Sequence, residues 1–348
     1  MQLDKVILSN FRSYAQKEIT FSPHLNCVFG DNAVGKSNLL EAIYLLSTGK
    51  SFRTHYLHDL VRHSEKNFRI EAKFSKDGSS DSLVLVYGTD GRKMLYNNTA
   101  HASFLPLLGL LPCVLLTPED ISILTGAPAQ RRRFLDLHLS QMDPLYIHHL
   151  GRYHKAMKQR NALLKQKEAK GLDPWEQIMA ASASYLIEKR QETLLVLQPF
   201  VEETISELSE TRERFSWVYE NSLGSSDPLH ILEQWKKSRG KELLLGSTLS
   251  GPHRDDILFY LQEQEIKTYC SEGQKRSCIA ALRLAEWQRL YAFLGTAPLF
   301  GIDDFGAHLD AKRTTILQKM TRNLGQVFLT APSFSPVEEV QFSMTSLP

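Results

Sequence analysis

The stretch at positions 30–37 constrains this chain more than any other, because it fits the pattern G-x-x-x-x-G-K-[ST]. The apolar run 25–29 before it predicts a buried strand, and apolar residues at helical spacing over 39–46 predict a helix after it. A strand, a glycine-containing loop and a helix in this order are the context in which the pattern binds phosphate. An ordinary glycine-rich turn capped by Ser or Asn is the competing interpretation. The eight residues are Gly30, Asp31, Asn32, Ala33, Val34, Gly35, Lys36 and Ser37.

The residue types in this loop suit a triphosphate. Glycines let backbone amides wrap an anion, and the start of the helix adds its partial positive charge. We expect Lys36 to reach the terminal phosphates and the Ser37 hydroxyl to help hold a Mg2+ ion. The chain is therefore predicted to bind a nucleoside triphosphate.

The composition is that of a globular protein, with 42% hydrophobic and 23% charged residues in a chain of 348. Lys and Arg number 41 and Asp and Glu number 39, so the net charge of +2 neither requires nor excludes nucleic acid. The four cysteines have no metal-like spacing, which favours reduced thiols and a cytoplasmic location. The sequence contains no N-terminal apolar signal and no long apolar run, so we expect neither secretion nor a membrane span.

The pattern of apolar residues changes twice along the chain, from α/β to helical and back to α/β. Alternating runs at 68–74, 82–87 and 93–96 predict an antiparallel meander beside the nucleotide-binding strand. From about 128 to 241 the pattern is helical, and α/β character returns afterwards. We therefore predict an α/β fold, a mixed sheet with flanking helices, that is interrupted by a helical arm. The three predicted parts are residues 1–120, 121–242 and 243–348.

A second part of a nucleotide site is predicted near the end of the chain. The apolar segment 298–302 is followed by Asp303 and Asp304. A carboxylate in this position can fix the water shell of Mg2+, and a neighbouring one can orient or deprotonate the attacking water. We assign the metal role to Asp303 and the water role to Asp304. The alternative is two acids at an ordinary strand-to-loop junction, and Gly301 weakens the strand pattern.

A further anion site is predicted at the start of the long amphipathic helix 273–294. Ser271, Gly273 and Gln274 offer a hydroxyl, free amides and the positive end of a helix. A capping box formed by Ser271 and Gln274 fits the same residues, and both interpretations can hold together.

Two groups of basic residues are candidates for contact with DNA. Arg131, Arg132 and Arg133 follow Pro128, which suits a first helical position, so they lie near a helix start whose field opposes cations. Such a cluster invites an external or cross-subunit anion, although pairing with a local acid such as Asp136 is equally open.

The second basic group lies in the stretch 152–170, which contains seven Lys or Arg and one acid. Lys155, Lys158 and Lys165 are the candidate DNA contacts, and Arg160 belongs to the same run. A solvated helix face is the alternative to a face that contacts a phosphate backbone.

In their order and spacing, these motifs resemble the RecF family of bacterial recombination-mediator ATPases, relatives of the SMC and ABC-type ATPases. The similarity extends over nearly the whole chain, and the stretch 118–136 is the most specific part of it. The matching segments are residues 10–14, 30–43, 118–120, 126–128, 131–136, 251–256, 271–277, 303–304 and 309–310.

The resemblance implies an ABC/SMC-type ATPase head assembled from both ends of the chain, with ATP and Mg2+ as ligands and weak DNA-stimulated hydrolysis. It also implies a homodimer that closes around ATP, with Ser271 to Gly273 of one subunit facing the nucleotide of the other. That dimer would clamp DNA near single-strand/double-strand junctions or gaps. RecR and RecO are the implied partners in loading a recombinase, in DNA repair, replication, recombination and the SOS response.

The chain departs from the family pattern at three places. Ala33 replaces a usual glycine, residues 305–308 differ before Leu309 and Asp310, and Thr330 ends the last strand where transporter-type ATPases have histidine. A transporter ATPase subunit and a nucleotide-bound scaffold without hydrolysis remain alternatives. A P-loop GTPase or small-molecule kinase is a third, and the lack of an Asn-Lys-x-Asp motif argues against a GTPase.

Overall fold

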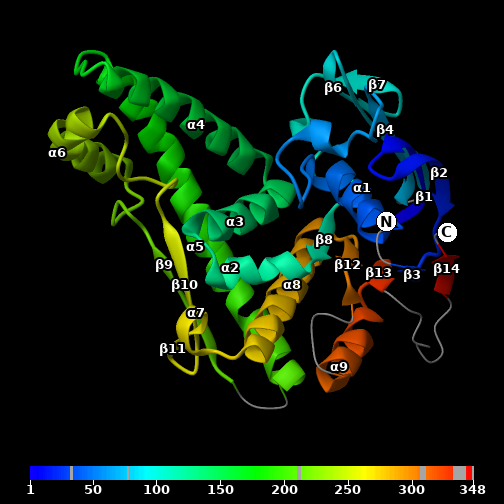
Figure 1. Cartoon of the computed structure of the whole chain (residues 1–348). Helices are drawn as coiled ribbons and strands as arrows, with labels where there is room; N and C mark the ends of the chain where they lie inside the picture. Colours follow the sequence, from blue (N-terminus) through cyan, green and yellow to red (C-terminus); the bar gives the residue numbers. More distant parts are fainter. Residues whose placement is uncertain (32–33, 77, 210–212, 306–310, 332–341, 347–348) are drawn as a thin grey trace. The chain divides into compact units, whose positions relative to one another are not determined.

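In the computed structural model, whose helices and strands are labelled in Figure 1, the chain forms two compact units. The first contains Met1–Asp120, Thr204–Arg212 and Glu272–Pro348, and the second contains Ile121–Glu203 and Glu213–Ser271. The predicted division at residues 120 and 242 stays a prediction. The structure describes residues 1–31, 34–76, 78–209, 213–305, 311–331 and 342–346.

The first unit contains an antiparallel sheet of six strands in the order β2-β1-β4-β5-β6-β7. Alternate side chains of β4 are buried, as expected for a strand with one face on a core. The predicted meander is present, but it is hydrogen-bonded to β1 and belongs to a different sheet from the nucleotide-binding strand, which corrects its predicted position. The strands are β1 Gln2–Phe11, β2 Tyr14–Thr20, β4 Phe68–Lys76, β5 Ser79–Gly88, β6 Gly91–Tyr96 and β7 Thr99–His101.

The second sheet of this unit is parallel throughout, with the order β14-β3-β13-β12-β8. Its strands β8 and β12 are buried along their whole length, which explains their continuous apolar sequences. Strand β3 from the start of the chain lies beside β13 and β14 from its end (Figure 1). The strands are β3 Leu25–Phe29, β8 Cys113–Leu116, β12 Leu299–Ile302, β13 Val327–Ala331 and β14 Phe342–Ser346.

Helices connect the two sheets of the first unit. Helix α1, Lys36–Thr48, packs against β4 and β5 of one sheet and β8 and β13 of the other. Helix α8, Glu272–Leu294, packs against β8. It also contacts the segment that follows β8, because Arg283 of α8 forms a paired salt bridge with Asp120. Helix α9 covers Ala311–Thr321, and the short helices η1, η2 and η3 cover Leu57–Leu60, Leu105–Leu107 and Pro118–Asp120.

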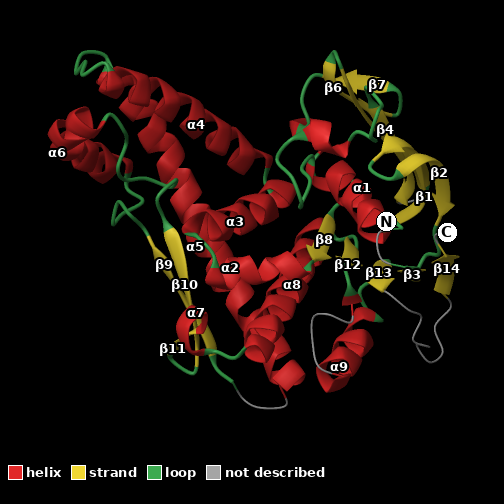
Figure 2. Cartoon of the chain, in the orientation of Figure 1, coloured by secondary structure: helices red, strands yellow, loops and turns green. Residues whose placement is uncertain are grey.

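The second unit is mainly helical (Figure 2). Its helices are α2 Ile121–Thr125, α3 Pro128–Met142, α4 Pro144–Lys165, α6 Pro228–Leu245, α7 Ile266–Tyr269 and most of α5 Leu172–Ser209, whose last residues from Thr204 belong to the first unit. A three-stranded antiparallel sheet accompanies them, with the order β11-β10-β9. The strands are β9 Phe215–Glu220, β10 Asp256–Leu261 and β11 Gln264–Glu265.

Strand β9 lies within the region 128–241, whose sequence pattern predicted helices, and so corrects that prediction at residues 215–220. Phe215 and Trp217 of β9 contact each other and Phe259 of β10 through their rings. The strand is stabilised by this aromatic cluster and by pairing with β10, a partner distant in sequence.

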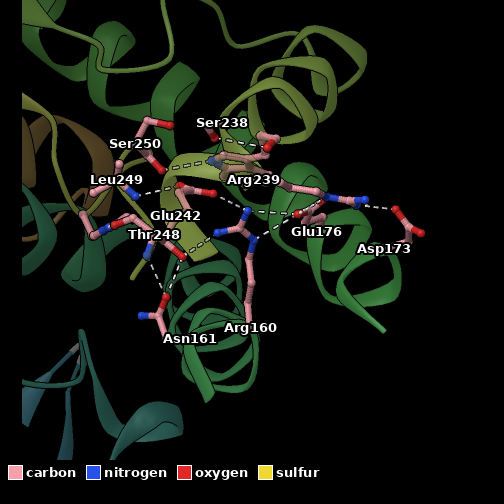
Figure 3. A network of polar contacts seen from close by, with 12 residues as sticks. Arg160, Asn161, Asp173, Glu176, Ser238, Arg239, Glu242, Thr248, Leu249 and Ser250 are labelled. Carbon is pink, nitrogen blue, oxygen red and sulfur yellow. Dashed lines mark hydrogen bonds and ion pairs between the residues drawn. The ribbon is translucent and has the colours of Figure 1, made fainter. Parts of the chain in front are cut away.

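Arg160 organises a polar network inside the second unit, which corrects its predicted place among the exposed basic residues (Figure 3). Its side chain is fully buried, donates to Glu176, Glu242 and Thr248, and lies over the ring of Trp235. In Figure 3 the Arg160 guanidinium points toward these acceptors from α4. A buried charge is tolerated only where opposite charges and hydrogen bonds compensate it. Because the acids that compensate Arg160 of α4 belong to α5 and α6, the network links these three helices.

Among the described residues, no helix combines the length and apolar character needed to cross a bilayer.

Candidate nucleotide-binding site

The predicted phosphate loop and the predicted metal site meet in one pocket of the first unit. The pocket has a volume of about 300 Å3 and lies where β3, β12 and β13 end. Because parallel strands present their carboxyl ends at one edge, residues near 36 and near 303 come together there. The lining residues are Gly35, Lys36, Ser37, Asn38, Arg53, Pro118, Glu119, Asp303, Asp304 and Thr330.

The loop after β3 requires glycine at position 35. Gly35 has a φ of 109°, and a Cβ there would lie 2.7 Å from the Ser13 hydroxyl. Tyr14 donates a hydrogen bond of 3.0 Å to the Gly35 carbonyl, and burial raises the pKa of Tyr14 to about 12, which keeps the phenol a donor. The β1–β2 turn therefore holds the start of α1 in position.

Lys36 lies over its own loop. Its Nζ donates to the carbonyl oxygens of Gly30 at 2.6 Å and Asp31 at 2.9 Å. Asn32 and Ala33 lie outside the described residues, so the departure at Ala33 is not tested. Val34 packs partly buried against the core.

Asp303 and Asp304 follow β12 directly. Asp303 is buried and donates its backbone N–H to Leu116 in β8, whereas Asp304 is exposed. Gly301, which weakened the strand pattern, is explained by packing: a Cβ there would lie 2.7 Å from the Leu115 side chain. The strand accommodates the glycine because neighbouring leucines fill the space.

Glu41 organises the basic side of the pocket, a role that the sequence analysis missed. This fully buried carboxylate accepts two hydrogen bonds of 2.8 Å from Arg12 and one from Ser51. Arg53 lies 3.9 Å from the same carboxylate and donates to Asn38 in the pocket lining. A single acid among the apolar residues of 39–46 was the available signal.

The predicted second anion site lies at the N-terminus of α8. Gly273 and Gln274 lie in its first turn, and within the described part of the first unit they are not among the residues that line the pocket. Ser271 groups with the second unit. Leu309 and Asp310 lie outside the described residues.

The arginines of α3 have internal partners. Arg131 is buried and forms a paired salt bridge with Asp256, at 2.5 and 2.9 Å. Arg132 donates to the Asp255 carbonyl, and burial, followed by the charge of Arg190, lowers its pKa. Arg131 therefore has an acidic partner within the chain, but this acid is Asp256, 125 residues away, and not a local one such as Asp136, which pairs with Arg190. Because Arg131 is buried in this salt bridge, its predicted direct contact with DNA is corrected.

The remaining DNA candidates differ in exposure. Arg133 is half-buried on α3, whereas Lys155, Lys158 and Lys165 are exposed on α4. The buried face of α4 carries Tyr153 and Leu164. The three lysines are therefore accessible to a polyanion.

The parallel sheet, the phosphate loop after β3 and the acidic residues after β12 define a P-loop protein of the ABC/SMC ATPase class. A family model described as "RecF/RecN/SMC N terminal domain" matches residues 2–342. The "DNA replication and repair protein RecF" of Protochlamydia amoebophila is 43% identical over 336 residues, covering 95% of this chain and 94% of that protein. The chain belongs to the RecF family.

Solved structures agree with this fold. The recombination mediator protein RecF-ATP in the RecFOR pathway superposes with a TM-score of 0.90 and 32% identity, over 97% of this chain and 93% of that one. A Smc head domain with an extended coiled coil from Pyrococcus furiosus has a TM-score of 0.55 at 15% identity, over 95% of this chain and 90% of that chain. The latter likeness supports the fold alone.

Proposed function

We propose that this chain is an ATP-dependent DNA-binding protein of DNA replication and recombinational repair. The observation that carries the proposal is that Lys36 and Ser37 line the same pocket as Asp303 and Asp304. The RecF name of its relatives and a RecF-ATP structure of the same fold support the same conclusion.

In this proposal the pocket residues divide the work on ATP. Lys36 neutralises charge on the terminal phosphates, and backbone amides at the start of α1 bind the phosphate oxygens. Asp304 orients the attacking water and accepts its proton as the bond between the γ-phosphorus and the bridging oxygen breaks, giving ADP and phosphate. Arg53, which also lines the pocket, supplies a further positive charge.

The pocket suits Mg2+. Ser37 and Asp303 both line it, and hydroxyl and carboxylate oxygens are the ligands that this hard cation prefers. Ser37 and Asp303 would hold the ion, which when bound neutralises charge on the phosphates.

ATP binding is proposed to close a homodimer on DNA. Ser271 precedes α8, and Gly273 and Gln274 lie in its first turn. In the proposed dimer these three residues face the nucleotide of the partner subunit. Lys155, Lys158 and Lys165 offer an exposed basic face for the phosphate backbone. RecR and RecO are the proposed partners in loading a recombinase at gaps, with weak DNA-stimulated hydrolysis reopening the clamp.

The experiment is a measurement of mass in solution by light scattering, with and without ATP and with and without gapped DNA. We expect a dimer with ATP and a larger complex when gapped DNA is added, and we expect Lys36→Ala to stay monomeric under both conditions. The clamp proposal fails if ATP alters neither the mass of the protein nor its affinity for DNA. If ATP is bound and the dimer forms without turnover, the non-hydrolysing scaffold is the better description.

A further inference from the structure

Thr330 lies in the strand that separates the phosphate loop from the two aspartates. Strand β13 is hydrogen-bonded to β3 on one side and to β12 on the other. In the ladder Thr330 is opposite Val28 of β3, and Leu329 is opposite Ile302, so Asp303 follows next to Thr330. Thr330 is 1% exposed and lines the nucleotide pocket. No role for its hydroxyl was expected from the sequence.

The Thr330 hydroxyl makes two hydrogen bonds of opposite polarity. It donates to Asp303 Oδ1 at 2.7 Å, and it accepts from the backbone N–H of Asp304 at 2.8 Å. A hydroxyl has one hydrogen and two acceptor lone pairs, so both bonds can be made at the same time. One side chain therefore holds the carboxylate of the first aspartate and the backbone of the second.

The backbone of Asp304 needs this support. Its φ is 53°, a left-handed conformation that residues other than glycine adopt uncommonly. Such a conformation persists where the surrounding structure determines it, and it is frequent at functional sites. The hydrogen bond from the Asp304 N–H to Thr330 fixes the peptide that joins the two aspartates.

We propose that Thr330 is a positioning residue, which orients Asp303 toward the metal and Asp304 toward the attacking water. This inference rests on the proposed ATPase function and deepens it. Valine has nearly the shape of threonine but lacks the hydroxyl, so Thr330→Val removes both hydrogen bonds and keeps the packing of β13. Serine keeps the hydroxyl, so Thr330→Ser preserves the bonds.

The test compares these two variants with wild type and with Thr321→Val. Thr321 is a matched control, because it is also buried and its hydroxyl donates to a backbone carbonyl, but it does not line the nucleotide pocket. ATP hydrolysis and the binding of a ribose-labelled fluorescent ATP analogue are measured across a Mg2+ titration, and melting temperatures are recorded for all four proteins.

For Thr330→Val we expect kcat to fall about 10- to 100-fold, as for other residues that orient metal ligands, with little change in KM for ATP. The Mg2+ concentration that half-saturates binding of the analogue should rise. Thr330→Ser should recover most of kcat and the Mg2+ response, and Thr321→Val should match wild type. A role in stability alone would lower the melting temperature of Thr330→Val and leave its Mg2+ response unchanged.

Normal turnover and a normal Mg2+ response in Thr330→Val would overturn the inference, and so would equal losses in the Val and Ser variants. The Mg2+ titration of binding decides the matter even if wild type hydrolyses ATP too slowly to measure. If wild type fails to bind the analogue and matches Lys36→Ala, the proposed function itself fails, a result distinct from an unaffected Thr330→Val.

Discussion

At the scale of single residues, the pocket depends on groups held by short, specific contacts. Lys36 is oriented by two carbonyl oxygens of its own loop, and Gly35 is required both by its φ and by the approach of the β1–β2 turn. These contacts place a cation beside backbone amides at the start of a helix. An anionic phosphate is the ligand that such an arrangement favours.

Replacement of Lys36 by alanine should therefore weaken ATP binding. A hydrogen bond to a charged group contributes about 1.5–3 kcal/mol, so one lost phosphate contact corresponds to a loss of roughly 10- to 150-fold in affinity. Titration with a fluorescent ATP analogue measures this. Lys5→Ala is the control, because Lys5 forms an exposed pair with Glu18 in the same unit. Equal affinities of Lys36→Ala and wild type would remove Lys36 from the site.

His253 predicts a pH dependence of stability. Its Nδ1 lies 2.7 Å from the Tyr153 hydroxyl and its Nε2 lies 3.2 Å from the Thr248 carbonyl, an arrangement that suits the neutral ring. Burial lowers the pKa of His253 to about 4. The nearby charges of Arg254, His154 and Arg132 also lower the pKa of His253.

Because the unfolded chain takes up this proton near pH 6.5 and the folded chain only near pH 4, stability should fall as the pH drops through this window. The contribution from His253 is about 2 kcal/mol by pH 4.5. Urea unfolding at pH 7 and pH 4.5 measures it, and His253→Gln should show a smaller decrease than wild type. An identical decrease in both proteins would contradict the assignment.

At the scale of elements, buried charge joins the helices of the second unit. Arg160 of α4 is shared between Glu176 of α5 and Glu242 of α6, and Arg239 of α6 returns to Glu176 and Asp173. A buried ion pair adds little net stability over apolar packing, but removal of one partner strongly destabilises the fold, because it leaves the other charge buried without compensation. It therefore selects the alignment of the helices.

Arg160→Ala should lower the free energy of unfolding by about 3–5 kcal/mol, because it leaves buried carboxylates with less compensation. Lys189→Ala is the matched control, since Lys189 pairs with Glu192 on the exposed face of α5 and should cost less than about 1 kcal/mol. Urea denaturation followed by circular dichroism compares the two. A similar midpoint for both variants would show that the network contributes no more than a surface pair.

At the scale of the whole molecule, the proposed activity joins nucleotide binding to DNA binding. The first unit carries the pocket, and the second carries an exposed basic face on α4. Lysines that contact phosphate release counterions from DNA, so their number is measured by the salt dependence of affinity.

The double variant Lys155→Gln and Lys158→Gln should reduce the slope of log K against log salt by about 1.8, or about 0.9 for each lost contact with duplex DNA. Fluorescence anisotropy over a range of KCl concentrations measures the slope. Lys5→Gln with Lys93→Gln removes the same charge from the first unit and should leave the slope unchanged if α4 is the contact. An unaltered slope in the α4 variant would return this helix to the solvated-face interpretation.

Local sequence patterns predicted the main motifs of this protein and the elements next to them. The phosphate loop, the helix after it and the apolar strand before Asp303 were all predicted, because glycine geometry, helical spacing and apolar runs act over a few residues. Charged side chains were predicted less well. Arg131 and Arg160 share the sequence signature of exposed cations, and only acids more than fifteen residues away decided that both are buried.

Tertiary structure decided which residues complete the site. Glu41 is one turn beyond the phosphate loop, and its only local signal is that it is a single acid among apolar residues. Thr330 is near the far end of the chain, and its place at the end of a strand does not show which residues it contacts. Thr330 meets Asp303 and Asp304 because a parallel sheet places β13 beside β12 and in register with it. Strand order depends on contacts between segments hundreds of residues apart, so local sequence patterns do not predict it.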